Sequence, residues 1–134
     1  MIAVDTSVVV AGFASWHEGH RVAMAALARA PRVPAHVLIE TYSVLTRLPV
    51  PHRAPAHLVA AFLAETFPAP PLALPPREHL LLLEQAAALG ISGGSIHDAL
   101  IAATARHVKA RLLTRDRRAA ATYERLHVEY EMLA

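Results

Sequence analysis

The sequence predicts an α/β protein, a three-layer sandwich in which a short-stranded, mainly parallel central sheet is flanked by helices. Short apolar runs alternate with longer amphipathic segments along the chain, which is the pattern of parallel strands connected by helices. The chain has 134 residues, 54% of them hydrophobic, which is enough for one substantial core. It has no internal repeat and no linker, so we expect a single domain over residues 1–134.

The first third of the chain is predicted to begin with a buried strand at residues 2–4. Two structures remain open for residues 8–14. Asp5, Thr6 and Ser7 are good N-cap residues for a short helix, whereas the run of valines favours an extended strand. Amphipathic spacing then predicts helices over residues 18–30 and 35–48.

The prolines separate the elements in the middle of the chain, because all ten of them lie between residues 31 and 76. The last pair precedes a helix at its first turn, where proline is tolerated. Further helices are expected over residues 55–67, 76–89, 96–109 and 117–124, and further strands over residues 72–74, 111–114 and 127–130.

Composition excludes several classes of protein. There is no cysteine, which rules out disulfides, thiolate metal sites and a cysteine nucleophile. No stretch approaches the roughly 18 charge-free apolar residues of a membrane span. The apolar N-terminus lacks a basic region and carries Asp5 early, so it is interpreted as a core strand and not as a signal peptide. We therefore expect a cytoplasmic protein with no membrane partner.

The positive charge is concentrated near the C-terminus. The net charge is only +2, but residues 101–134 hold seven Lys and Arg against four Asp and Glu. A basic rim beside an acidic pocket suits a phosphodiester substrate and a metal. Solvated helix faces explain the same charges without any ligand.

Four acids lie where a folded chain would solvate them poorly: Asp5, Glu40, Asp98 and Asp116. An unpaired buried carboxylate is costly, so such groups are normally paired, hydrogen-bonded or bound to metal. Asp5 and Asp116 each follow an apolar strand, and ligands bind beyond the carboxyl ends of parallel strands. Thr114 should point to the same side as Asp116 and could position a ligand. If the four acids converge, they form an oxygen-rich pocket suited to a hard divalent cation.

Each acid also has a local explanation that needs no ligand. Asp5 and Asp116 could simply cap the helices that follow them. Glu40 could be a half-solvated residue at the boundary of a helix face. Asp98 comes three residues after Ser95, which is the spacing of a capping box.

The nine histidines raise the alternative of a zinc hydrolase. His17 and His20 are three residues apart and would share a helix face. A catalytic zinc site needs about three such ligands, and no His-Glu-x-x-His motif is present. His97 is interpreted as a helix-start residue near the pocket, so the zinc hydrolase is disfavoured.

Four segments, in this order and at these separations, resemble the PIN-domain nucleases, and most closely the VapC toxin ribonucleases of bacterial toxin–antitoxin pairs. The resemblance spans essentially the whole chain and implies an endoribonuclease that depends on Mg²⁺ or Mn²⁺. The segments are Met1–Val10, Ile39–Leu45, Ile91–Ala105 and Leu112–Ala119.

The resemblance also implies roles for individual residues. The catalytic and metal-binding quartet would be Asp5, Glu40, Asp98 and Asp116, with Thr6 and Thr114 as auxiliary hydroxyls. Some relatives carry a further acid just after the position of Asp116, whereas two arginines follow here, so the number of metal ions stays open. The candidates to hold flanking phosphates of RNA are Arg115, Arg117 and Arg118.

A homodimer and a cognate antitoxin that binds near the active site are further implications of the resemblance. The alternative from another class is a catalytically silent PIN-fold binding or scaffold module, because a fold does not fix a function. Retention of all four acids argues against that alternative.

Overall fold

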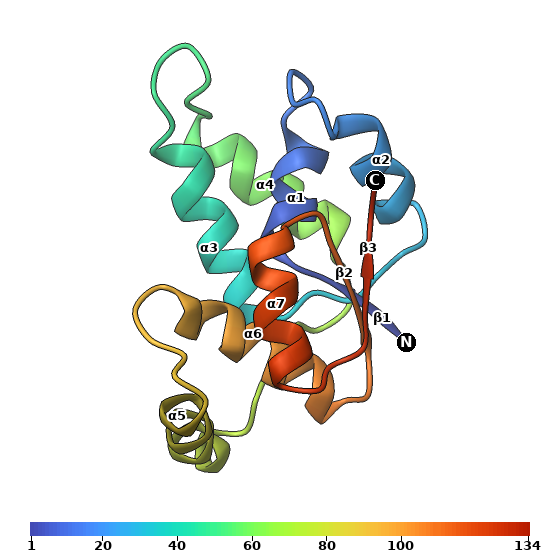
Figure 1. Cartoon of the computed structure of the whole chain (residues 1–134). Helices are drawn as coiled ribbons and strands as arrows, with labels where there is room; N and C mark the ends of the chain where they lie inside the picture. Colours follow the sequence, from blue (N-terminus) through green and yellow to red (C-terminus); the bar gives the residue numbers. More distant parts are fainter.

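The computed structural model describes all 134 residues and has a fully parallel three-stranded sheet in the order β1-β2-β3 (Figure 1). The strands are β1 (Ile2–Val4), β2 (Arg111–Thr114) and β3 (Tyr130–Met132). Ala3 lies opposite Leu112, and Leu113 lies opposite Glu131. The predicted α/β class with a parallel sheet is confirmed.

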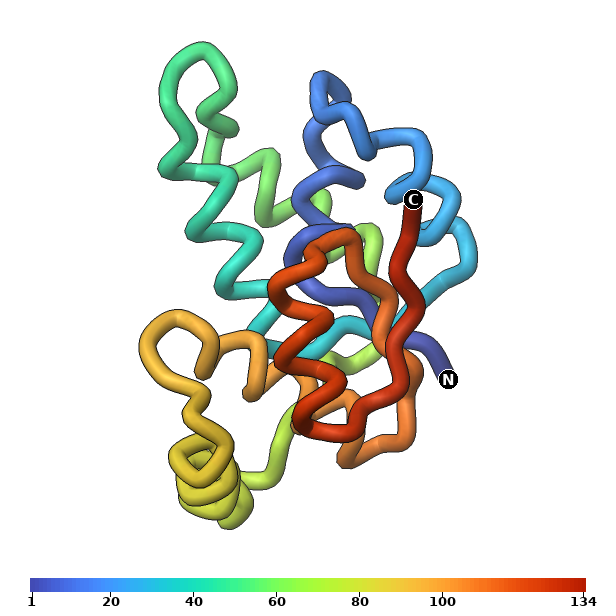
Figure 2. The backbone as a smooth tube through the Cα atoms, viewed as in Figure 1, coloured from blue at the N-terminus to red at the C-terminus, as the bar shows by residue number.

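Seven α-helices surround this sheet. Of these, α1, α6 and α7 all contact the central strand β2, and α7 stands in front of α1 in Figure 1. Figure 2 shows the turquoise α3 and the yellow α5 to the side of the strands. The helices are α1 (Thr6–Phe13), α2 (His20–Leu27), α3 (Ala35–Thr46), α4 (Ala56–Thr66), α5 (His79–Ala88), α6 (Ser95–His107) and α7 (Arg117–Arg125), with a 3-10 turn η1 (Pro76–Glu78) before α5.

The central strand explains why the sheet needs helices on both faces. Successive side chains of a strand point to opposite faces, and both Leu112 and Leu113 are fully buried. Burying each leucine contributes about 2 kcal/mol, and truncating one to alanine in such a core costs about 2–5 kcal/mol. One continuous core of 29 buried residues joins the strands to the helices. None of the helices combines the length and the apolarity needed to cross a bilayer.

The helix alternative is correct for the segment after β1. The Asp5 side chain accepts hydrogen bonds from the backbone N–H groups of Ser7 and Val8 and starts α1 there. This cap, together with burial of Val8 and Val9, outweighs the strand propensity of the valines.

The strand predicted at residues 72–74 is absent from the sheet. Leu72 makes only an isolated bridge to Pro34, with its N–H donated to Val33 and its carbonyl accepting from Ala35. Prolines on both segments remove the donors that a longer ladder would need.

The last strand begins later than the predicted residues 127–130. The reason is the turn that ends α7: the Val128 N–H bonds the Tyr123 carbonyl, and the His127 N–H bonds the Glu124 carbonyl, each at 3.1 Å. This is a Schellman motif, with His127 in the left-handed region at φ 57°. The motif occupies His127 and Val128, which had been predicted to belong to the strand.

Candidate active site

Asp5 stands directly after β1 and is held by four donors. Its Oδ1 accepts from the Ser7 N–H at 3.0 Å, the Ser7 hydroxyl at 2.6 Å and the Val8 N–H at 3.4 Å. Its Oδ2 accepts from the Tyr123 hydroxyl at 2.8 Å. The residue is only 2% exposed, and this burial raises the pKa of Asp5 even though hydrogen bonds from Ser7, Thr114 and Tyr123 act to lower it. The cap therefore exists, and Oδ2 still has a free lone pair.

Asp116 repeats this arrangement after β2. Its Oδ1 accepts from the backbone N–H groups of Arg118 at 2.9 Å and Ala119 at 3.3 Å, and it caps α7. Its own N–H donates to the Thr114 hydroxyl at 3.1 Å. Thr114 is fully buried, and its hydroxyl lies 3.5 Å from the hydroxyl of Ser7. Thr114 thus supports the two carboxylate-bearing turns from beneath and does not line the cleft itself.

The other two acids project from the sides of helices. Glu40, on α3, accepts a hydrogen bond at Oε1 from the hydroxyl of Thr6. Asp98 lies in the first turn of α6, but the capping box with Ser95 is not formed, because the N-cap residue of α6 is Gly94 and Ser95 is already inside the helix. Burial, together with the negative charges of Asp116, Glu40 and Asp5, raises the pKa of Asp98 to about 6.

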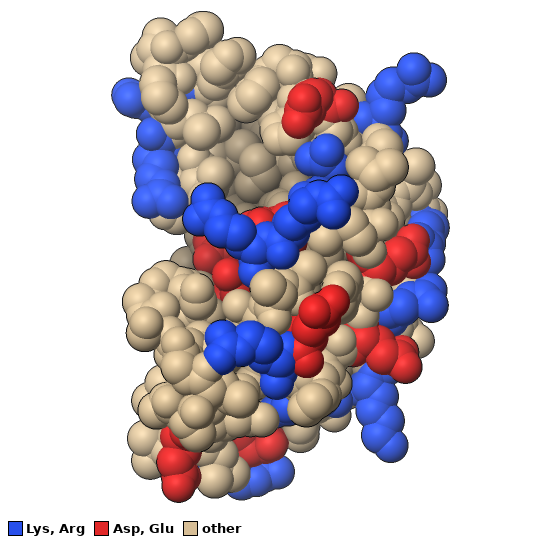
Figure 3. All heavy atoms as spheres, viewed as in Figure 1, with Lys and Arg blue, Asp and Glu red and all other residues tan.

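All four acids line one cleft of about 610 Å³, together with Thr6 and Tyr123. Three arginines line the same cleft: Arg47, Arg115 and Arg117. Figure 3 shows Lys and Arg side chains across the middle of this face, above acidic atoms in a hollow. Arg118 is exposed and lies outside the cleft lining, whereas Arg47, at the end of α3, had not been assigned to the site from sequence.

Gly19 leaves room for the side chain of Arg115 beside the cleft. Its guanidinium fills the space where a β-carbon on Gly19 would stand, and its Nε donates to the Ala134 carbonyl at 3.4 Å. The Arg115 N–H donates to the Ser7 hydroxyl at 2.8 Å, which ties this backbone to the Asp5 turn.

The interpretation of His17 and His20 as a pair on one helix face is wrong. His17 precedes α2, lines the cleft and accepts the Gly19 N–H on its Nδ1 at 2.9 Å. His20 instead places its Nδ1 2.9 Å from the Ala11 carbonyl. The Nδ1 atom of each of these two histidines therefore contacts a backbone group.

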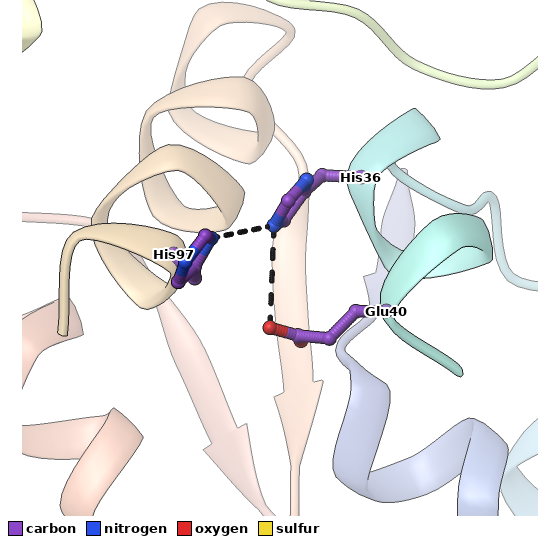
Figure 4. Close-up of side chains that lie close together, drawn as sticks. All are labelled: His36, Glu40 and His97. Atoms are coloured by element: carbon purple, nitrogen blue, oxygen red, sulfur yellow. Dashed lines mark hydrogen bonds and ion pairs between the residues drawn. The ribbon is translucent and has the colours of Figure 1, made fainter. Parts of the chain in front are cut away.

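A different histidine pair meets beside the cleft, and sequence reasoning missed it. His36 and Glu40 lie one helical turn apart on α3, and His97 faces them from α6 (Figure 4). The four-residue spacing of His36 and Glu40 was visible in the sequence. The approach of His97 was not, because it depends on how α3 packs against α6.

The quartet fits a hard divalent cation. Its donors are carboxylate oxygens, which suit Mg²⁺ and Mn²⁺. The pKa of Asp98 is raised by burial and by the repulsion of the other carboxylates, and a cation among them would offset both effects.

Comparison with known proteins identifies the family of the chain. The PIN domain family model matches residues 2–125, and the chain therefore belongs to the PIN-domain family, within its VapC group. It is 51% identical over 99% of both chains to Ribonuclease VapC40 of Mycobacterium tuberculosis. It is 41% identical to Ribonuclease VapC27 of the same species, covering 99% of this chain and 97% of that one. The resemblance inferred from the four segments is confirmed.

Two solved structures share the fold at low sequence identity. FitAcB from Neisseria gonorrhoeae superposes with a TM-score of 0.68 at 18% identity, over 97% of this chain and 96% of that chain. FitAB bound to a DNA fragment gives a TM-score of 0.72 at 16% identity, over 98% and 94%.

Proposed function

We propose that this protein is a divalent-metal-dependent endoribonuclease and the toxin of a toxin–antitoxin pair. The observation that carries the proposal is the convergence of four carboxylates, from four separate elements, on one cleft with a basic rim. Near full-length similarity to two proteins named as ribonucleases supports RNA as the substrate. Because one core joins the chain, residues 1–134 are taken as a single nuclease domain.

The cation would be held by Asp5, Glu40, Asp98 and Asp116, and Mg²⁺ or Mn²⁺ suits these ligands. When bound, it would activate water and neutralise the charge that develops on the phosphoryl group. The protein's own contribution is to place the carboxylates before substrate arrives. Thr6 orients Glu40, and Ser7 and Tyr123 fix Asp5.

The arginines would position the RNA. Arg115 and Arg117 line the cleft and can bind the phosphates on either side of the scissile bond. Arg118 lies outside the cleft lining and would act mainly through long-range attraction. Burial and the charge of Asp5 raise the pKa of Tyr123, so its hydroxyl stays protonated and keeps donating to Asp5.

Protein partners complete the proposal: a second copy of the chain, in a homodimer, and a cognate antitoxin in the cytoplasm. Exposed apolar side chains support such contacts, since Ile39 is 69%, Leu80 77% and Leu81 61% exposed. Sedimentation analysis of the purified chain, alone and with its cognate antitoxin, tests both contacts.

The deciding experiment is cleavage of a mixed cellular RNA pool with Mn²⁺, with EDTA, and with Asp5→Asn. Cleavage should require both the metal and Asp5, while Asp5→Asn keeps its fold, because an asparagine oxygen can still accept the cap hydrogen bonds. Glu65→Gln, an exposed acid on α4, is the matched control and should cleave normally.

Failure of the folded protein to cleave, together with a melting temperature that Mn²⁺ does not raise, would overturn the proposal. The chain would then be a metal-free binding module on the PIN fold. A full rate in EDTA would equally exclude the metal-dependent mechanism.

A further inference from the structure

We propose that His36, His97 and Glu40 form a second cation site, which takes a transition-metal dication such as Zn²⁺ at the side of the carboxylate cleft. One ligand atom from each of the three residues lies within 4.8 Å of the other two (Figure 4). His36 Nε2 is 3.0 Å from His97 Nδ1 and 4.0 Å from Glu40 Oε2. No other trio of potential ligands in the chain is as close together.

These separations suit a shared ion. Two ligands of a tetrahedral Zn²⁺, each about 2.0–2.1 Å from the metal, are roughly 3.3 Å apart. The distances of 3.0 Å and 4.0 Å lie on either side of that value. The third pair, His97 and Glu40, lies within 4.8 Å. Side-chain rotations that close the two longer separations would bring the three atoms onto one centre.

The hydrogen bond between the two rings supports the same assignment. The rings are parallel to within 3°, and one imidazole donates a proton to the lone pair of the other. A dication can take the place of this proton once the donating ring carries its N–H on its other nitrogen, because both facing nitrogens then donate a lone pair to the metal. Since His97 is exposed, solvent can supply a further ligand.

The type of donor separates this site from the carboxylate cleft. Two nitrogens and one carboxylate suit Zn²⁺ and other transition metals, whereas the all-carboxylate quartet suits Mg²⁺ or Mn²⁺. Two cations of different chemistry would thus be sorted into adjacent sites.

Glu40 connects the two sites. Thr6 donates to its Oε1, and its Oε2 is the oxygen that faces His36. This hydrogen bond is the kind of support that orients a metal-binding carboxylate. Zn²⁺ on the histidines would neutralise Glu40 and remove its charge from the quartet. Inhibition of RNA cleavage by Zn²⁺ would follow, and this one consequence depends on the proposed nuclease function.

The test is direct binding of Zn²⁺ by titration calorimetry, in excess Mg²⁺ so that the carboxylate cleft is saturated. The intact chain should bind one Zn²⁺, and Co²⁺ in its place should give the visible absorption of a nitrogen-ligated ion. His36→Ala and His97→Ala should each weaken Zn²⁺ binding at least about tenfold. His57→Ala, an exposed histidine on α4, is the matched control and should bind Zn²⁺ as the parent does.

Asp116→Asn separates this proposal from the proposed nuclease function. It removes a quartet carboxylate but no ligand of the second site, so it should retain full Zn²⁺ affinity. Equal loss in Asp116→Asn and His36→Ala would place the ion in the carboxylate cleft and overturn the second site. Equal Zn²⁺ affinity of His97→Ala and the parent would also overturn it. Because the His97 side chain is exposed, this substitution should leave the fold intact, and circular dichroism checks that it does. These outcomes stand whether or not the chain cleaves RNA.

Discussion

The cleft has two halves that are built in different ways. In the strand half, Asp5 and Asp116 each cap a helix and each accept two backbone N–H groups. In the helix half, Glu40 and Asp98 project from α3 and α6. No protein group donates a hydrogen bond to the Asp98 carboxylate. The strand half is therefore fixed by the local chain, whereas the helix half depends on how two helices pack.

The difference shows in how negative charge is accommodated. Asp5 is the most deeply buried of the four, yet it has four hydrogen bond donors. Asp98 is less buried but has none of these, so desolvation and neighbouring acids raise its pKa to about 6. The carboxylate of Asp98 thus lacks the donors that Asp5 has, and a cation would offset its burial and the repulsion of its neighbours.

The largest effect is expected for Asp98→Asn. Removing one carboxylate from the helix half should lower the RNA cleavage rate by about 100-fold or more, as for other groups that stabilise a developing charge. In EDTA the same variant should melt at a higher temperature than the parent, because a neutral amide is less costly to bury than a carboxylate and is not repelled by the neighbouring acids. A rate assay and a thermal melt check the two effects. A variant with normal cleavage would remove Asp98 from the catalytic machinery.

The strand half should respond through stability. Tyr123→Phe leaves Asp5 Oδ2 without its donor and should lower the free energy of unfolding by about 1–3 kcal/mol. Urea denaturation measures this change. Tyr130→Phe is the control: its hydroxyl bonds exposed Glu124, and its loss should change stability by less than about 0.5 kcal/mol. Equal effects of the two variants would contradict the special role of the Asp5 contact.

Asp98, in the helix half, should make the stability of the cation-free protein depend on pH. The pKa of Asp98 is about 6 in the folded protein against an ordinary value of 3.8, so the native state binds this proton more tightly than the unfolded chain. The stability of the cation-free protein should therefore fall as pH rises from 3.8 to about 6. Melting in EDTA across this range measures it, and Asp98→Asn should flatten the curve. A parent protein that gains stability over the same interval would contradict the assignment.

The smallest effect should come from the rim. Arg117→Ala should raise the KM for RNA several-fold and reduce its salt dependence, because Arg117 lines the cleft. Arg118→Ala, one residue further along, should change KM less, since its side chain lies outside the cleft lining. Cleavage kinetics at two salt concentrations compare them. Identical salt slopes would show that the two arginines act only through overall charge.

The same contrast explains what the sequence could predict. Asp5 and Asp116 could be placed at one sheet edge from local signals, because each follows a strand and precedes a helix. Glu40 and Asp98 needed the family resemblance, since their convergence depends on the packing of α3 against α6.

Tertiary packing also decided the features that local patterns missed. The His36–His97 contact joins residues 61 positions apart, so no local pattern indicates it. The predicted strand at residues 72–74 had the right apolar character, but a neighbour rich in prolines could not pair with it beyond one bridge.

Gly19 has a consequence for genetic screens. Its φ of −88° is open to any residue, so it is space and not backbone conformation that requires a glycine there. The atoms that an alanine would meet belong to the guanidinium end of the long Arg115 side chain, which can rotate aside at little cost in stability. A Gly19→Ala allele should therefore yield normal amounts of folded protein while mimicking loss of the Arg115 guanidinium. Toxicity selections would recover it as a partial loss-of-function allele that alters no charged residue.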